Sequence, residues 1–174
     1  YRLMVIFDDV ICKESVMNFV QDVKEGVAQL QENENLIIYF STNGGEMHLL
    51  PIILDVFYKY REYIELRLNY VMQSAGLSLL LHLVKEFPDI NIWITDTFSN
   101  AMLHQVRTYL DTACKNKELV NKQVEEYNKK LLTSLKGKIT KEEIKKFNNL
   151  EDLYFDRERV IKMFPSLLSV DYML

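Results

Sequence analysis

Ser74 is the residue of this chain best placed to act as a nucleophile. It lies in the segment VMQSAGLSLLLHL (71–83), where alternating apolar residues give way to a continuous apolar run. The periodicity predicts a strand over 64–72 and a buried helix over 76–86, so Ser74 falls at the N-terminus of the helix. The helix dipole favours negative charge there, and the N–H of Ala75 is one of the donors that a helix leaves unpaired. A nucleophile beside such a donor has half of an oxyanion hole.

A simpler interpretation of Ser74 is that it caps the helix, because serine is favoured at the N-cap position. The segment also differs from the Gly-x-Ser-x-Gly elbow of α/β-hydrolases, since Met72 stands where that motif has glycine.

A second candidate element of an oxyanion hole is the turn Asn43-Gly44-Gly45, which follows the apolar run LIIYFS (36–41). Glycines allow a ligand to approach the backbone closely, so we expect the N–H of Gly45 to be the second oxyanion donor. The same residues also suit a plain turn between a strand and a helix.

Among the three histidines, His104 is the candidate general base, because it ends the apolar run NAMLH (100–104) and so lies at the end of a strand. We expect His82, inside LLLHLV, to be a packed, hydrogen-bonded core residue. His48 follows the glycines and could line the site without taking part in catalysis.

Two aspartates in NNLEDLYFDRERV (148–160) could hold the histidine in the right tautomer and offset the charge that it gains. They are Asp152 and Asp156. Asp156 begins a helical pattern and is better explained as a helix N-cap.

The composition predicts an ordinary globular domain. The chain has 174 residues, of which 48% are hydrophobic and 26% charged, and its formal net charge is -4. This charge argues against binding to nucleic acid or to an anionic membrane. Cys12 and Cys114 are far apart, so we expect no disulfide framework and a reducing, cytoplasmic compartment. We also expect no membrane span and recognise no signal peptide.

Strand-like and helical periodicities alternate along the chain. They predict an α/β fold with a largely parallel sheet, in one domain over residues 1–174. The expected strands are 2–7, 36–41, 64–72, 90–95 and 100–104, and the expected helices are 16–30, 49–63 and 76–86.

The C-terminal third predicts a long amphipathic helix over about 106–135. Its apolar stripe includes Val120, Val124, Tyr127 and Leu131, at spacings that helices use to pack on one another. A helix of this length would extend beyond its own core, so we expect the chain to be a homo-oligomer in which this helix carries part of the contact. Thr140-x-x-Glu143 then matches a capping box that starts a further helix.

Taken together, these segments resemble the proteolytic subunit of the Clp protease, in the wider Clp/crotonase superfamily. The family's Ser-Pro-Gly-Gly motif is matched by residues 42–45, and its Gly-Gln-Ala-Ala-Ser-Met-Gly motif by residues 70–76. The family's Met-Ile-His-Gln stretch is matched by residues 102–105, and its aspartate near the C-terminus by Asp152. The four motifs occur in the family's order, and the resemblance covers nearly the whole chain.

The resemblance implies a Clp/crotonase-like fold, a spiral of repeated β-β-α units with a largely parallel sheet, in which residues 106–135 form a protruding handle helix. It implies a serine endopeptidase in which Ser74 attacks, His104 transfers the proton and Asp152 orients His104. The N–H groups of Gly45 and Ala75 form the oxyanion hole in this assignment, and no cofactor is needed.

The resemblance also implies a homo-oligomeric ring whose substrates are peptides or unfolded proteins. An ATP-dependent unfoldase can be a partner of such a ring. Two alternatives stay open. One is a Clp-like scaffold without activity, and the other is a crotonase-like acyl-CoA enzyme, which would use the same two N–H donors without a Ser–His pair.

The sequence departs from the family at three places. Asn43 replaces the motif proline, Tyr70 replaces a glycine, and residues 106–111 replace a glycine-rich strand. The sequence therefore predicts a divergent member of the family.

Overall fold

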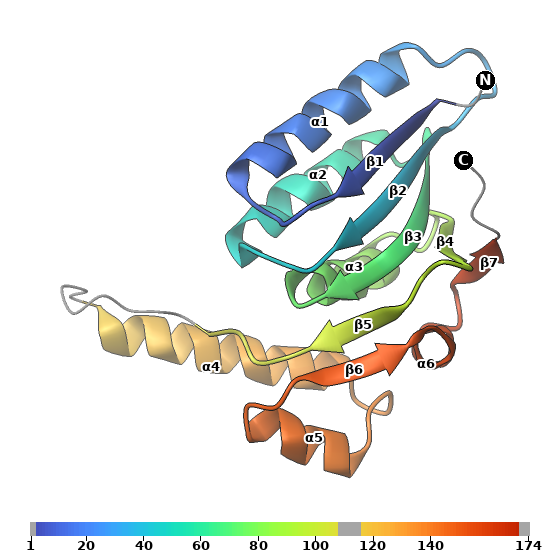
Figure 1. Ribbon diagram of the computed structural model, residues 1–174. Helices are drawn as coiled ribbons and strands as arrows, with labels where there is room; N and C mark the ends of the chain where they lie inside the picture. The colour runs from blue at the N-terminus through green and yellow to red at the C-terminus, as the bar shows by residue number, and fades with distance from the viewer. Residues whose placement is uncertain (1–2, 108–115, 171–174) are drawn as a thin grey trace. The chain divides into compact units, whose positions relative to one another are not determined.

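The computed structural model describes residues 3–107 and 116–170 of the chain (Figure 1). The described residues form strands, α-helices and one short 3₁₀ helix, η1. In chain order these are β1 (Met4–Asp8), α1 (Lys13–Ala28), β2 (Leu36–Thr42), η1 (Met47–Leu49), α2 (Leu50–Tyr60), β3 (Ile64–Gln73), α3 (Ala75–Glu86), β4 (Ile92–Thr95), β5 (Asn100–Leu103), α4 (Lys117–Ser134), α5 (Lys141–Asn148), β6 (Leu153–Asp156), α6 (Arg157–Met163) and β7 (Leu168–Val170).

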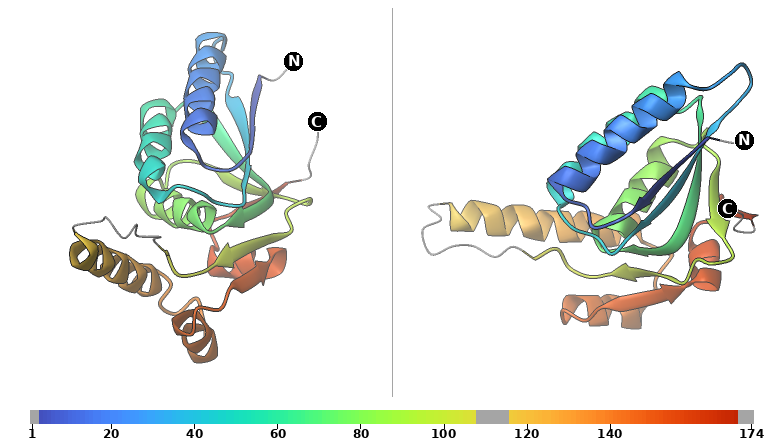
Figure 2. Two further views of the ribbon diagram at one scale, coloured as in Figure 1. Left: turned by 60° about the vertical axis from the view of Figure 1, so that its left-hand side comes forward. Right: turned by 45° about the horizontal axis from the view of Figure 1, so that its top comes forward.

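The strands form one seven-stranded sheet in the order β1-β2-β3-β4-β7, with β5 paired to both β3 and β6. The pairings β1–β2, β2–β3, β3–β4, β3–β5 and β4–β7 are all parallel. Helices α1, α2 and α3 lie on the same face of β1–β3 (Figure 2). The predicted α/β fold with a largely parallel sheet is therefore confirmed.

The core lies between these helices and the sheet, and a row of apolar side chains crosses it. Phe7 pairs with Phe40, Phe40 with Leu68, and Leu68 with Ile94 in adjacent strands. Phe7 and Phe40 are stacked with ring centroids 4.5 Å apart, and Phe19 of α1 meets both rings edge-on at 5.6 and 5.8 Å. Each such aromatic pair contributes about 1 kcal/mol beyond the burial of its area.

The opposite face of the sheet contains a buried cation. Arg67 pairs in register with Tyr39, donates to its Oη over 3.0 Å, and its Nη2 lies 2.6 Å from Oε1 of Glu65. Burial alone would lower the pKa of Arg67, but the hydrogen bonds and charges of Glu65 and Tyr39 raise it above its ordinary value. Arg67 is therefore a permanently charged structural residue of the sheet.

Strands β2 and β3 change register just before the candidate site. Phe40 pairs with Leu68, whereas Thr42 pairs with Met72, so β3 contains extra residues. Tyr70 lies in this bulge with φ 49°, a left-handed conformation that is rare for a bulky residue. The hydroxyl of Ser41 accepts from the Val71 N–H and donates to its carbonyl, both over 3.3 Å, and so bridges the interrupted ladder.

Contacts within the chain group it into two compact units. The first contains Tyr1–Met102 and Tyr154–Leu174, and the second contains Leu103–Leu153. The second unit contains α4 and α5, and its buried apolar residues include Leu131 of α4, Leu135 just after α4, and Phe147 of α5. The single domain over residues 1–174 and the protrusion of its helix stay predictions.

The predicted start of the long helix at Val106 is wrong. Val106 and Arg107 are not helical, residues 108–115 lie outside the described residues, and α4 begins at Lys117. The reason lies in Asn128 of α4, whose side-chain amide binds both the N–H and the carbonyl of Val106 and so replaces helical bonds there. At 18 residues, α4 is about 27 Å long. Leu131 of the predicted packing stripe is 6% exposed, so this residue belongs to the core and is not available to a partner.

The predicted capping box is confirmed at the start of α5. The N–H of Glu143 donates to Thr140 Oγ1 over 3.1 Å, and the N–H of Thr140 donates to Oε2 of Glu143 over 2.6 Å. Within residues 3–107 and 116–170, no helix has both the length and the apolar character needed to cross a membrane.

Candidate active site

Ser74 occupies the single residue between β3 and α3. Its φ of 53° and ψ of -117° are strained for a residue other than glycine. Its N–H donates to the Met102 carbonyl of β5 over 2.9 Å, and its carbonyl accepts the N–H of Ser78 over 3.2 Å. Backbone bonds on both sides therefore hold this conformation.

Ser74 stands at the N-cap position, but its side chain makes no capping hydrogen bond to α3. The capping interpretation therefore does not explain why a serine is there. Strained residues that the surrounding structure holds in place are characteristic of functional sites.

The turn after β2 lies directly against Ser74. Gly44 has φ 108°, and a Cβ on it would lie 2.7 Å from Cβ and 3.2 Å from Oγ of Ser74. Gly45 has φ 143°, and a Cβ on it would lie 2.2 Å from the carbonyl oxygen of Ile11. Both positions therefore require glycine, for its conformation and for the close approach.

Two backbone N–H groups, those of Gly45 and Ala75, are the predicted oxyanion donors. The Gly44 N–H donates to Thr42 Oγ1 over 3.0 Å, and the Glu46 N–H donates to the Ile11 carbonyl over 2.8 Å. Neither bond uses the N–H of Gly45, which lies between them in the chain. The N–H of Ala75 opens α3 and has no acceptor within the helix.

His104 and Asp152 come together in the second unit. Nδ1 of His104 lies 3.5 Å from Oδ1 of Asp152, and their side chains are 29% and 44% exposed. His104 directly follows β5 and Asp152 directly precedes β6, and these strands pair. The structure thus places the predicted base and the predicted acid side by side.

Asp156 has the role that the sequence indicated for it. It is the N-cap of α6, and its Oδ1 accepts the N–H of Arg159 over 2.8 Å. This capping bond accounts for Asp156 without a role in catalysis.

The other two histidines are surface residues. His48 lies in η1 with its side chain 72% exposed, and its Nε2 is 3.3 Å from Oε2 of Glu46. The prediction that His82 is packed in the core is wrong, because its side chain is 43% exposed. It is hydrogen-bonded as predicted, with its Nδ1 2.9 Å from Oε1 of Glu86. Leu79, Leu80 and Leu83 form the buried side of α3, and the helical period turns position 82 outward.

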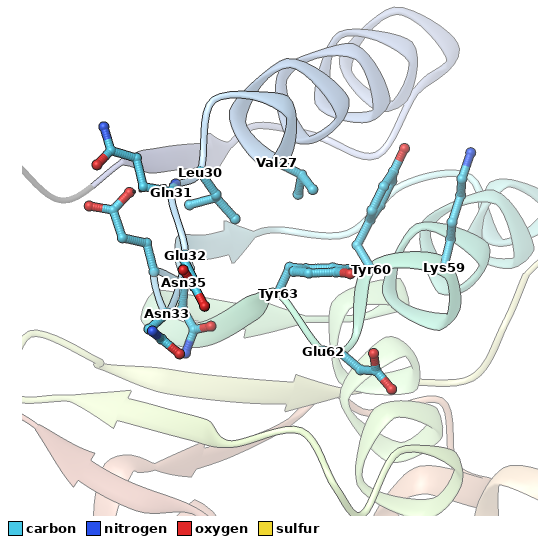
Figure 3. A pocket seen from close by; sticks show the side chains of 11 residues that line it. Val27, Leu30, Gln31, Glu32, Asn33, Asn35, Lys59, Tyr60, Glu62 and Tyr63 are labelled. Atoms are coloured by element: carbon cyan, nitrogen blue, oxygen red, sulfur yellow. Dashed lines mark hydrogen bonds between the residues drawn. The ribbon is translucent and has the colours of Figure 1, made fainter.

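A surface groove lies at the amino ends of strands β2 and β3, opposite the end that is followed by Gly45 and Ser74. It is formed by the loop before β2 and the turn before β3, and Tyr60 and Tyr63 face it together with Lys59 (Figure 3). The Lys59 Nζ lies 5.2 Å from the centroid of the Tyr60 ring. Ser74 and Gly45 instead follow the carboxyl ends of β3 and β2, the end at which parallel sheets usually bind ligands.

Among known structures, the chain is similar to a point mutant of ClpP1 from Listeria monocytogenes. The two share 12% sequence identity, and the match covers 97% of this chain and 91% of that chain with a TM-score of 0.68. The chain has a ClpP-like fold. No protein-family model and no curated protein matches the sequence.

The ClpP-like fold confirms the expected Clp/crotonase-like architecture.

Sequence reasoning missed two residues that support the candidate site. Asn128 is buried and fixes Val106, two residues after His104, through bonds of 2.8 and 3.2 Å. The sequence did carry a signal for Asn128. It is a lone amide on an apolar helix face, four residues after Val124 and three before Leu131. The second missed residue is Thr42, whose hydroxyl binds the backbone of Gly44.

Proposed function

We propose that this chain is a serine peptidase of the Clp type. The observation that carries the proposal is the strained conformation of Ser74, held against Gly44 at a helix N-terminus without a capping role. The pairing of His104 with Asp152 supports the assignment of a base and its orienting acid. The ClpP-like fold supports the reaction class by analogy alone.

In the proposed reaction, Ser74 Oγ attacks the carbonyl carbon of a peptide while His104 accepts the hydroxyl proton. Asp152 holds the imidazole in the right tautomer and offsets its positive charge. The N–H groups of Gly45 and Ala75 bind the oxyanion of the tetrahedral intermediate. His104 then protonates the leaving amine, and water releases the acyl group from Ser74 in the reverse sequence of proton transfers.

The wider setting is also part of the proposal. A ClpP-like fold suggests a ring-forming homo-oligomer. We propose a cytoplasmic ring that cleaves peptides or unfolded proteins, and an ATP-dependent unfoldase is the class of partner that would deliver them.

A fluorophosphonate probe tests the proposal, because it reacts with serines that a base activates. We expect a single adduct on the wild-type chain, located at Ser74 by peptide mass spectrometry, and cleavage of short fluorogenic peptides. Ser74→Ala and His104→Ala should each lower peptide cleavage by about 10⁴-fold or more.

Ser78→Ala is the matched control, since Ser78 is a buried serine of the same helix, one turn further along. It should leave labelling intact. A wild-type chain without any adduct would show the inactive scaffold, and specific binding of an acyl-CoA by that unlabelled chain would show the crotonase-like enzyme. An adduct at Ser78 would mean that the nucleophile is assigned wrongly.

A further inference from the structure

Thr42 has a buried hydroxyl whose two hydrogen bonds both go to one glycine. It is the last residue of β2 and is 2% exposed. Its Oγ1 accepts the N–H of Gly44 over 3.0 Å and donates to the carbonyl of the same residue over 3.3 Å. A threonine side chain has few accessible rotamers, so the hydroxyl is a firm support for the backbone that it binds.

The Gly44 carbonyl is held from a second side as well. The N–H of Ile11 donates to it over 2.8 Å. This carbonyl and the N–H of Gly45 belong to the same peptide unit, which is planar and trans, so the two groups point in opposite directions. Bonds that hold the carbonyl toward Thr42 and Ile11 therefore direct the Gly45 N–H away from them.

Such support is needed because the peptide unit lies between two glycines. Glycine has a wide choice of backbone dihedrals, so a peptide between two of them can rotate at little cost. An oxyanion donor is effective only when its direction is fixed before the charge develops.

The methyl group of Thr42 makes a second contact, with the helix that follows Ser74. A Cβ built on Gly76 would lie 2.5 Å from Cγ2 of Thr42, so the methyl group lies against the first turn of α3. That turn begins with Ala75, the other proposed donor. One side chain thus touches both backbone segments of the proposed oxyanion hole.

We infer that Thr42 is a positioning residue, whose hydroxyl fixes the Gly44–Gly45 peptide so that the Gly45 N–H is directed at the oxyanion. This inference rests on the proposed function. It predicts that loss of the hydroxyl lowers the rate of the chemical step and leaves substrate binding nearly unchanged.

Two substitutions separate the hydroxyl from the methyl group. Thr42→Val keeps the shape and removes the hydroxyl, and we expect kcat to fall about tenfold with KM nearly unchanged. This is less than the 10²–10³-fold loss that follows complete removal of an oxyanion donor. Thr42→Ser keeps the hydroxyl and removes the methyl group, so it should retain most of kcat.

Amide hydrogen exchange at Gly44, followed by NMR, measures the supporting bond without any activity. Exchange should be faster in Thr42→Val than in the wild type and in Thr42→Ser. Equal kcat in Thr42→Val and the wild type overturns the inference, as does an equal loss in both variants.

The outcome for the wild type distinguishes this inference from the proposed function. If the wild type carries a Ser74 adduct and cleaves peptides but Thr42→Val is unaffected, only the role of Thr42 is wrong. If the wild type is neither labelled nor active, the proposed function fails, and the positioning role falls with it, whatever the exchange rates at Gly44.

Discussion

The turn around Ser74 and the segment around His104 are held in place by different kinds of hydrogen bond. At Ser74 two of the bonds join backbone to backbone, from the Ser74 N–H to Met102 and from the Ile11 N–H to Gly44, and the hydroxyl of Thr42, two residues before Gly44, supports them. After His104 the bonds come from side chains, because the amide of Asn128 takes both backbone groups of Val106.

The difference determines which substitutions each region tolerates. A turn held by backbone bonds and by neighbouring side chains depends on glycine wherever two segments approach closely, and on local residues such as Thr42. A segment that side chains hold depends on a few polar residues far away in the sequence. The following predictions test this contrast, from the largest expected effect to the smallest.

Asp152→Asn should lower kcat by about 10⁴-fold, because an amide favours the wrong tautomer of His104. The measurement is peptide hydrolysis at saturating substrate, together with the thermal midpoint, which should change little since Asp152 is 44% exposed on its side chain. Asp156→Asn is the matched control. Asparagine caps helices about as well as aspartate, so activity should persist. The reverse pattern would make Asp156 the orienting acid.

Gly44→Ala should abolish labelling by the fluorophosphonate and destabilise the chain by about 3 kcal/mol. The added methyl group needs an unfavourable φ and would lie 2.7 Å from Cβ of Ser74, which cannot move without the backbone. Labelling and urea denaturation measure the two effects.

Gly137→Ala isolates the conformational part of that cost. Gly137 also has a positive φ, 81°, but among the described residues no heavy atom beyond its own chain neighbours lies within 4 Å of the position that its Cβ would take. It should cost about 1–2 kcal/mol and leave labelling unchanged. Equal labelling of the two variants would show that Gly44 does not touch the nucleophile.

Asn128→Ala should destabilise the chain by about 2 kcal/mol, because it removes two hydrogen bonds and leaves the backbone of Val106 without these partners. Amide exchange at Val106 should accelerate. Asn128→Asp keeps an acceptor for the Val106 N–H but loses the donor to its carbonyl, so it should have an intermediate effect. An Ala variant as stable as the wild type would mean that this segment is held in another way.

The same contrast explains which features could be predicted from the sequence. The strands and helices near Ser74 follow apolar periodicity, and the turn at Gly44 and Gly45 has the only residue type that its φ values allow. Local patterns therefore predicted this region well. The predicted start of the helix at Val106 was wrong, because the side chain of Asn128, 22 residues later in the chain, binds the backbone of Val106. The core position predicted for His82 was wrong, because an apolar run does not reveal that one of its side chains turns outward to bond Glu86.

Thr42 was missed for a related reason. Its hydroxyl acts on a residue two positions away, within a motif in which threonine is chemically ordinary. Its importance depends on the orientation of a peptide plane, which residue types alone do not encode.

Tyr70→Gly should have the smallest effect of these substitutions. It tests whether the backbone of Tyr70, four residues before Ser74, is strained. Tyr70 has φ 49° and is 44% exposed, and its position corresponds to a glycine in the motif that the segment resembles. A left-handed residue other than glycine costs about 1–2 kcal/mol. Glycine removes this cost but raises the entropy of the unfolded chain, which offsets about 0.5–1 kcal/mol of the gain.

The informative comparison is between Tyr70→Gly and Tyr70→Ala, since both lose the aromatic side chain and only glycine relieves the strain. We expect the glycine variant to be the more stable by about 1 kcal/mol in urea denaturation. The Tyr70 carbonyl accepts the Ser99 N–H over 2.6 Å, and the Ser41 hydroxyl holds Val71, so the bulge should persist in both variants. Labelling of Ser74 should therefore continue in both. If the alanine variant were equally stable, the backbone at position 70 would not be strained.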